Sequence, residues 1–299
     1  RLKLDDLSVP LLDLSQKVNT TGQVEVLDIS PFPMVVLRAY GSPIRRRDEL
    51  VGSVILLQDV SEARRLENMR RDFLANVTHE LRTPLTSIRG FVEPLLDGTV
   101  SDERTRGRYL GIVRDEALRL SRLIDDILDL AKLESGSMSI SFDLLDIREL
   151  VFRVQNVFGP QAAQKGIELR SEVISPKEGE EILVFGDSDR LQQVLTNFLD
   201  NALRYTEFGG KITVSVEASD TRVIVKVADT GSGIDPEALP YVWERFYKAD
   251  KSREKSKKGT GLGLAISRGI IENHGGEVFA TSKPGEGATF GFVISRAET

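Results

Sequence analysis

The chain has 299 residues, of which 40% are hydrophobic, and this is enough to build the cores of two or three globular domains. Lys and Arg number 40 and Asp and Glu 46, so the net charge of −6 argues against a nucleic-acid or anionic-membrane surface as the main role. The absence of cysteine excludes disulfides and thiolate metal sites, and two histidines are too few for a histidine-rich metal site.

No apolar run reaches the roughly 18–20 residues that a membrane span needs, and no signal peptide opens the chain. Because the chain begins with Arg1 rather than Met, we expect a fragment of a longer protein, which leaves room for a membrane-anchored parent.

Residues 1–60 are predicted to form a small β-sheet. The runs QVEVLDI, PMVVLRAY and LVGSVILLQDV are rich in β-branched residues and are separated by Pro, Gly and the turn-like RRRD.

Two long helices follow from about Ser61. In the first, apolar residues recur at spacings of three and four, and the helix should end near Gly98, with Ser101 as the N-cap of the next helix. Each helix has about 35 residues and a length on the order of 50 Å, and a single hairpin cannot cover its own apolar stripe. We therefore expect a homodimeric antiparallel four-helix bundle. The apolar positions are Leu74, Val77, Leu81, Leu85, Ile88, Val92 and Leu95 in the first helix and Leu110, Val113, Ala117, Leu120, Ile124 and Ile127 in the second.

After a Ser/Gly-rich linker at 132–143, helical and strand patterns mix. Helices are predicted near 146–165, 188–205, 235–245 and 261–274, and half-buried strands at 211–218, 222–229, 276–282 and 288–296. The C-terminal part is therefore predicted to be an α/β sandwich.

The stretch FLANVTHELRTPLTSIRG places a histidine close to a proline inside a helix. Pro84 cannot donate an N–H to the carbonyl of Glu80, so we expect a bend beside His79 at a cost of roughly 3 kcal/mol. His79 lies about 200° around the helix from Val77 and should face outward. By itself it could be a solvated surface histidine, but Glu80 can accept a ring proton and leave the other nitrogen as a nucleophile. Thr83 shares the face of His79, and its presence excludes a zinc helix of the H-E-x-x-H type.

Two further patterns suit a bound polyphosphate. Asn197 and Asn201 lie one helical turn apart, and their amide oxygens suit a hydrated Mg²⁺, although two exposed asparagines would look the same. Asp229 ends a strand and is followed by Gly231 and Gly233, where bare backbone allows a ligand to approach closely.

A second glycine-rich stretch, GTGLGLAISRGIIENHGG, opens a helix behind Gly259, Gly261 and Gly263, so its N–H groups suit phosphate. Residues 247–259 are polar and basic, as expected of either a mobile lid or a plain surface loop.

The motifs HELRTP, NFLDNALRYT, DTGSGI, ERFYK and GTGLGL, in this order, resemble the H, N, G1, F and G2 boxes of sensor histidine kinases. The resemblance covers roughly residues 61–297. It implies a multidomain α+β protein with a dimerisation and histidine-phosphotransfer hairpin at 61–135 and an ATP-binding domain of the gyrase type at 143–297. The sequence as a whole is similar to the membrane-anchored sensor kinases that respond to phosphate and respiration. This similarity implies that the chain is the cytoplasmic portion of a bacterial sensor, and that this fragment makes no direct contact with the membrane.

By this resemblance His79 accepts the γ-phosphoryl group of ATP, Glu80 is the base, and Thr83 serves a phosphatase activity. Asn197 and Asn201 hold Mg²⁺ and phosphates, and Asp229 bonds the adenine amine. Arg204 stands where the family commonly has lysine, which changes the geometry of a phosphate contact. The other residues that the resemblance places at the nucleotide are Tyr205, Gly231, Gly233, Phe246 as the anchor of the lid, Lys248, Gly259, Thr260, Gly261, Leu262, Gly263 and Leu264.

Residues 1–60 resemble the C-terminal half of a PAS domain, with GSVILLQDVSEARRLE as its last strand and exit helix. The part that would wall a ligand pocket is missing, and a generic β-rich dimerisation module is the alternative.

Three functions remain open for the whole chain: an active autokinase with a response-regulator receiver domain as its partner, a kinase-dead phosphatase or scaffold, and a gyrase-like ATPase that uses nucleotide as a clamp. The third gives no reason for the face formed by His79, Glu80 and Thr83. The second function, a kinase-dead phosphatase or scaffold, is disfavoured because none of the five motifs has lost its characteristic residues.

Overall fold

The computed structural model describes residues 5–47, 49–174, 181–248 and 259–297. The chain divides into two compact units, Arg1–Thr78 and His79–Thr299, and each is described by itself.

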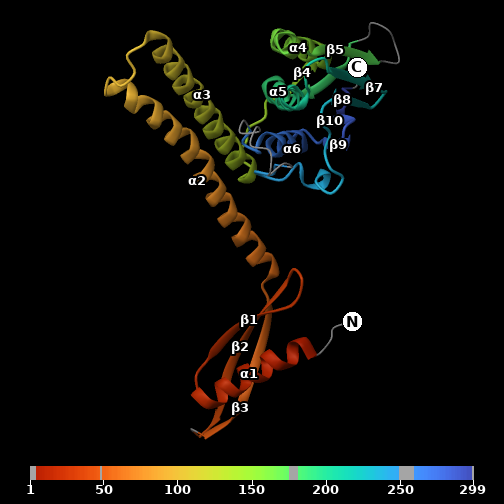
Figure 1. Cartoon of the computed structure of the whole chain (residues 1–299). Coiled ribbons are helices and arrows are strands. Elements are labelled where there is room, and N and C mark those ends of the chain that lie inside the picture. The colour runs from red at the N-terminus through yellow and green to blue at the C-terminus, as the bar shows by residue number, and fades with distance from the viewer. Residues whose placement is uncertain (1–4, 48, 175–180, 249–258, 298–299) are drawn as a thin grey trace. The chain divides into compact units, whose positions relative to one another are not determined.

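The first unit is a helix on a three-stranded antiparallel sheet. Helix α1 (Asp5–Thr21) is followed by β1 (Glu25–Phe32), β2 (Val35–Arg46) and β3 (Glu49–Asp59) in the order β1-β2-β3, with α1 lying along the sheet (Figure 1). Its core contains Leu14 and Val18 from α1 and Ile29 and Ala39 from the sheet. The sheet was predicted and α1 was not. Pro10 inside α1 obscures the helical signal, although Leu11, Leu14 and Val18 step by three and four.

The start of α2 (Ser61–Leu96) is joined to this sheet. The Ser61 hydroxyl accepts the N–H of Val36 at 2.9 Å, and the Asp59 carboxylate accepts the Ser61 N–H at 2.9 Å. Asp28 binds both Arg38 of β2 and Arg64 of α2, and these guanidinium groups hold its pKa well below the usual range. The sheet and the first turn of α2 are therefore held together by hydrogen bonds and by the two ion pairs of Asp28.

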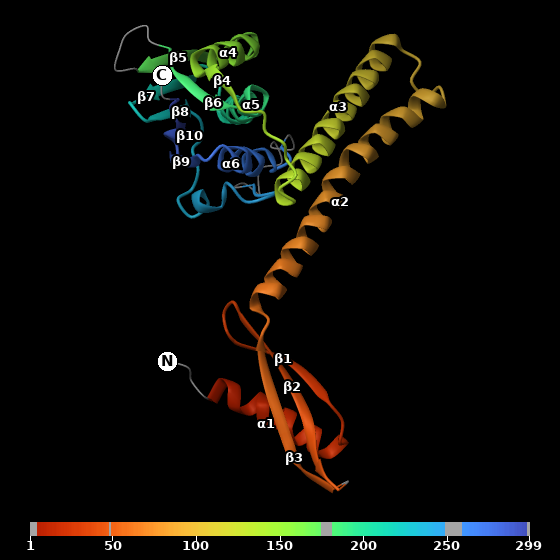
Figure 2. The ribbon, with the colours of Figure 1, turned by 180° about the vertical axis from the view of Figure 1, so that it is seen from behind.

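Helix α2 continues from the first unit into the second and is followed by α3 (Glu103–Glu134), antiparallel to it (Figure 2). The structure keeps α2 helical through Pro84, which is buried. Gly98 has a positive φ as expected, but the N-cap of α3 is Asp102 rather than Ser101, because the Asp102 carboxylate reaches the Thr105 N–H at 2.9 Å.

The C-terminal part of the second unit is an α/β sandwich. Its sheet has the order β5-β7-β8-β10-β9, with β5 (Glu168–Ile174) and β7 (Lys211–Ala218) parallel and the other pairs antiparallel. The remaining strands of this sheet are β8 (Arg222–Asp229), β9 (Glu277–Lys283) and β10 (Gly287–Ser295). Helices α4 (Ile147–Gln164), α5 (Ser188–Tyr205) and α6 (Gly263–Asn273) form the second layer (Figure 1), and β4 (Asp143–Asp146) pairs with β6 (Leu183–Gly186).

The predicted helices at 146–165, 188–205 and 261–274 and all four predicted strands are confirmed. The helix predicted at 235–245 is wrong, because this stretch contains only the short 3-10 helix η1 (Leu239–Tyr241). Pro240 lacks the N–H that an α-helix requires there, and its ring would crowd the preceding turn. The expected linker 132–143 is shorter than predicted, since α3 continues to Glu134.

No helix within residues 5–47, 49–174, 181–248 and 259–297 combines the length and the hydropathy needed to cross a bilayer.

Phe198 of α5 is the centre of an aromatic cluster between the helices and the sheet. It is 1% exposed, and its ring contacts those of Trp243, Phe290 and Phe292 at centroid distances of 6.2, 6.0 and 6.5 Å. This cluster holds α5 against β10, so the position of the helix depends on it.

We predict that Phe198→Ala lowers the free energy of unfolding by about 3–5 kcal/mol, because it leaves a cavity in this core. Urea denaturation measures the change. The matched control is Phe208→Ala, at a ring that is 89% exposed, which should change stability by less than about 0.5 kcal/mol. Equal losses in the two variants would contradict the assignment.

Candidate functional site

The predicted magnesium residues lie on the half-buried side of α5. The Asn197 amide nitrogen donates to the carbonyl of Gly263 at 3.0 Å and to the hydroxyl of Ser267 at 3.1 Å. This contact joins α5 to the first turn of α6 and leaves the amide oxygen of Asn197 for a ligand. Asn201 follows one turn later and is also half-buried.

Asp229 lies at the end of β8, where its carboxylate is held by the backbone. Its Oδ1 accepts the N–H of Gly231 at 2.8 Å and the N–H of Ala288 at 3.3 Å. Burial raises the pKa of Asp229, and these two N–H groups oppose that effect. The carboxylate is therefore fixed in orientation, with a second oxygen for a donor such as an amine.

Gly231 and Gly233 follow Asp229 in a close-packed turn. A Cβ atom at Gly231 would collide with the carbonyl of Tyr205, and one at Gly233 would collide with the carbonyl of Lys283. Gly233 also has a positive φ of 69°. Both positions require glycine for packing of the chain itself, apart from any ligand.

The second glycine stretch leads into α6. The N-cap, Leu262, is fully buried and its side chain makes no capping hydrogen bond, so the N–H groups of the first turn have no side-chain cap. A helix N-terminus whose N–H groups have no side-chain cap suits an anion. Thr260 accepts the N–H of Leu262 at 3.2 Å and so shapes the turn before the helix, while Leu264 is half-buried in the first turn.

Phe246 is joined to this glycine loop through the backbone. Its N–H donates to the carbonyl of Gly261 at 2.8 Å, and both residues have positive φ angles, 58° and 73°. A Cβ atom at Gly261 would come within 2.7 Å of the Phe246 Cα. The backbone bond between Phe246 and Gly261 thus connects the two segments that flank the predicted lid. Most of the lid itself, residues 249–258, lies outside the described residues.

Arg204 and Tyr205 end α5 beside these loops. The guanidinium of Arg204 lies against the backbone of Gly259, where a Cβ atom would collide with it. Tyr205 is 43% exposed. The structure therefore brings Arg204 to the glycine loop, as its predicted phosphate contact requires.

His79 is exposed on α2, as predicted from its position on the helix. The side chains beside it are engaged in other contacts. The Glu80 carboxylate binds Lys248 through Oε1 at 2.6 Å and Arg119 through Oε2 at 3.3 Å. The Thr83 hydroxyl donates to the carbonyl of His79 at 3.3 Å. Each carboxylate oxygen has a second lone pair, so these two contacts leave acceptor capacity on Glu80.

Sequence reasoning missed the pairing of Glu80 with Lys248 and the contact between Asp126 and Thr260. Their partners lie 168 and 134 positions apart, and no local pattern marks them. The Thr260 hydroxyl donates to Asp126 Oδ2 at 3.1 Å, and burial raises the pKa of Asp126 to about 6.

His274 has a structural environment unlike that of His79. Its Nε2 accepts the N–H of Asp187 at 3.0 Å, and its Nδ1 lies 2.8 Å from the carbonyl of Ile270. The ring is therefore the neutral tautomer with the proton on Nδ1, and both nitrogens are occupied.

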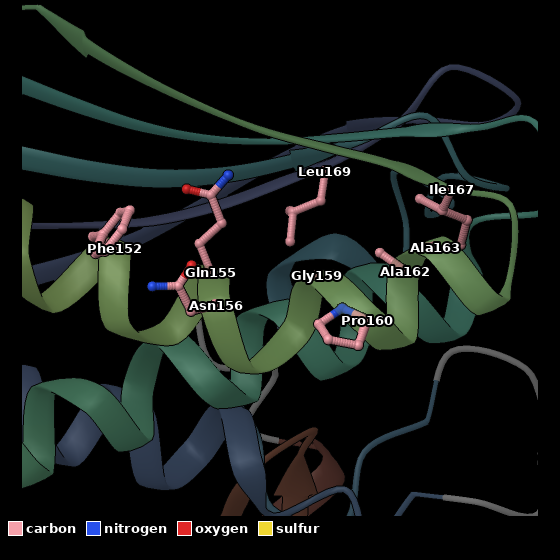
Figure 3. Close-up of a pocket in the computed structure, with 9 residues that line it drawn as sticks. All are labelled: Phe152, Gln155, Asn156, Gly159, Pro160, Ala162, Ala163, Ile167 and Leu169. Carbon is pink, nitrogen blue, oxygen red and sulfur yellow. The ribbon is translucent and has the colours of Figure 1, made fainter.

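A cavity of about 420 Å³ lies elsewhere, between α4 and β5 (Figure 3). Phe152, Gln155 and Leu169 are among its lining residues, and none of the lining residues belongs to the predicted site.

Two family models match this chain, one over the helical hairpin and one over the α/β sandwich. Residues 69–136 match the His Kinase A (phospho-acceptor) domain, and residues 186–298 match the histidine kinase-, DNA gyrase B- and HSP90-like ATPase family. Sensor protein SrrB of Staphylococcus aureus is 36% identical over 247 residues, which are 83% of this chain and 42% of SrrB. The chain thus spans less than half the length of that relative.

Two solved structures have the same fold. ShkA, determined full-length in complex with AMPPNP, is 33% identical with a TM-score of 0.57, over 76% of this chain and 46% of that one. ThkA, determined in complex with the response regulator protein TrrA, is 26% identical with a TM-score of 0.60, over 96% of this chain and 83% of that one.

A helical hairpin with an exposed histidine and an α/β sandwich with a glycine-lined site define a histidine kinase core. The chain belongs to the sensor histidine kinases of two-component systems.

We predict that Asp229→Asn lowers the affinity for adenine nucleotides at least about 100-fold, because an amide NH₂ would face the adenine amine in place of an acceptor. Isothermal titration with a non-hydrolysable ATP analogue measures this, and melting temperature reports folding. The control is Asp235→Asn in the same loop, an exposed carboxylate that accepts only the N–H of Glu237 among the contacts described. Unchanged affinity in a folded Asp229→Asn protein would disprove the assignment.

Proposed function

We propose that the protein phosphorylates itself on His79 with ATP and then transfers the phosphoryl group to an aspartate of a response-regulator receiver domain. The observation that carries this proposal is the exposed His79 in the same compact unit as Asp229 and the glycine loop. The structures of ShkA with AMPPNP and of ThkA with a response regulator support it by similarity.

The residues of the site fit ATP and Mg²⁺. Asp229 would accept the adenine amine, and the first turn of α6 and Arg204 would bind phosphate oxygens. The amide oxygens of Asn197 and Asn201 would hold Mg²⁺, which neutralises phosphate charge when bound. These are hard oxygen ligands, and Mg²⁺ keeps several waters in such sites.

In the proposed reaction a ring nitrogen of His79 attacks the γ-phosphorus, the bond to the β,γ-bridging oxygen breaks, and ADP leaves. Glu80 takes the imidazole proton on a lone pair that its contacts with Lys248 and Arg119 leave free. The regulator aspartate then attacks the phosphohistidine, and the nitrogen–phosphorus bond breaks.

We assign residues 61–135 to the dimerisation and phosphotransfer hairpin and 143–297 to the ATP-binding domain, with 1–60 as a PAS-like remnant. Apolar side chains remain exposed along the hairpin, and a second copy would cover them in a four-helix bundle. These residues are Leu85, Leu110, Leu118, Ile124 and Leu128. We also propose that the chain is the cytoplasmic portion of a membrane-anchored sensor.

The competing functions predict different chemistry. A gyrase-like clamp would hydrolyse ATP without labelling itself, and a kinase-dead scaffold would bind ATP and do neither. The exposed His79 favours the autokinase.

We predict that incubation with γ-labelled ATP and Mg²⁺ labels the protein through a phosphoramidate that is stable to base and lost in acid. His79→Gln should remove the label while ATP-analogue affinity stays unchanged, because the acceptor lies outside the nucleotide site. Phosphopeptide mapping locates the label. An acid-stable label, or a label that persists in His79→Gln, would refute the assignment.

We predict that Thr83→Ala removes most phosphatase activity toward a phosphorylated regulator while self-labelling is largely retained. The Thr83 hydroxyl shares the face of His79 and can position a water for in-line attack on the aspartyl phosphate.

The alternative role for Thr83 is its observed bond to the carbonyl of His79, which would affect helix stability only. Thr78→Ala is the matched control, because the Thr78 hydroxyl donates to the carbonyl of Leu74 at 2.8 Å on the same helix. Equal loss of kinase and phosphatase in Thr83→Ala, or equal effects of the two variants, would contradict a selective role.

A further inference from the structure

The hairpin and the ATP-binding domain of one chain meet through a series of polar contacts. Three carboxylates of α3 take part. Asp126 accepts the Thr260 hydroxyl at 3.1 Å, Asp129 binds Arg190 at 3.0 Å, and Glu134 forms an ion pair with Arg245. On α2, Glu80 binds Lys248 at 2.6 Å. Each of these four carboxylates therefore meets a cation or hydroxyl of the ATP-binding domain in the same chain.

The Asp129 contact shows that the surfaces fit closely. Asp129 Oδ2 also accepts the Gln193 amide at 2.8 Å, and the side chains of Arg190 and Asp129 are only 25% and 13% exposed. A partly desolvated carboxylate with two donors is held more firmly than an exposed surface pair. Leu133 adds an apolar contact, since it packs where a side chain at Gly269 would lie.

The Lys248 contact leads directly from the acceptor helix to the nucleotide loop. Lys248 holds Glu80, whose Cα is about 3.8 Å from that of His79. Two residues before Lys248, the Phe246 N–H bonds to the carbonyl of Gly261. The Glu80–Lys248 ion pair and the Phe246–Gly261 bond thus connect the neighbour of His79 with the glycine loop of its own chain, and the Asp126–Thr260 bond joins the same loop to α3.

We infer that autophosphorylation runs in cis, with Lys248 and the Asp129–Arg190 pair as positioning residues that hold a chain's ATP-binding domain against its own hairpin. This inference rests on the proposed kinase function. In a dimeric bundle each chain would then label its own His79, and the second chain would supply only the apolar partner surface.

Mixed dimers test this inference. Two differently tagged chains are co-expressed, and the mixed dimers are isolated by sequential purification on both tags. In the separated dimer one chain carries His79→Gln and the other Asp229→Asn. In the matched dimer one chain carries both substitutions and the other none, so the two dimers contain the same substitutions in total. Analogue titration and melting temperature confirm one working nucleotide site and intact folding in each.

Phosphorylation in cis predicts background labelling of the separated dimer and about half the wild-type rate in the matched dimer, because one of two symmetric sites works. The reverse result, with label in the separated dimer and none in the matched dimer, would overturn the inference. A wild-type homodimer that does not label itself would instead overturn the proposed kinase function. If the chain is monomeric, a rate per molecule that is independent of protein concentration supports cis, and a rate proportional to concentration refutes it.

A charge exchange tests the positioning role without touching the catalytic or nucleotide residues. Arg190→Asp should slow labelling several-fold with an unchanged KM for ATP, and the double variant Asp129→Arg/Arg190→Asp should recover most of the rate. A dimer with Arg190→Asp in one chain and Asp129→Arg in the other has no matched pair within a chain, so it should stay slow. Recovery in that crossed dimer, or an unchanged or faster single variant, would overturn the inference.

Discussion

The side-chain amide of Asn197 joins the two helices on which the candidate nucleotide site depends. Its donation to the Gly263 carbonyl and the Ser267 hydroxyl holds the first turn of α6 against α5. The uncapped N-terminus of α6 is therefore held against α5, and both of these hydrogen bonds use the amide nitrogen of Asn197 and not its oxygen. Phe198, the next residue, anchors α5 to the sheet that carries Asp229. The adenine and phosphate positions that we propose are thus related through one pair of adjacent residues.

In the structure Glu80 holds a cation of the ATP-binding domain beside His79. Its carboxylate binds Lys248 of that domain and Arg119 of α3, so the Lys248 ion pair brings the domain close to the histidine. Each carboxylate oxygen has two lone pairs, so the proposed role of Glu80 as base is compatible with both contacts. The side chains of Lys248 and Glu80 are 37% and 17% exposed, so the pair is partly shielded from solvent. Because α2 continues through Pro84 without a break, the bend predicted beside His79 would lie within a continuous helix.

The errors of sequence reasoning have local physical causes. The helix predicted at 235–245 followed the apolar spacing and underestimated Pro240, which the structure accommodates in a 3-10 turn. Strand β5 was not predicted because it lies at the edge of the sheet. Most of its side chains are exposed there, so its sequence lacks the alternation of apolar and polar residues that marks a half-buried strand. Helix α1 was missed because Pro10 interrupts a pattern that is otherwise helical.

The sequence by itself determined the two long helices, three helices and four strands of the sandwich, the exposure of His79 and the glycines around Asp229, because helical periodicity and close backbone packing are encoded by neighbouring residues. It determined the family as well, since five motifs occur in a single order. Only the tertiary structure decided which cations bind Glu80, that Asp126 accepts a hydrogen bond from Thr260 and that Asp129 forms an ion pair with Arg190. The packing of α3 against α5 and α6 brings Asp126 and Asp129 to their partners, while Glu80 of α2 meets Lys248 in the segment after η1. No local pattern in the sequence distinguishes these lysine, arginine and threonine residues from others of the same type on the surface.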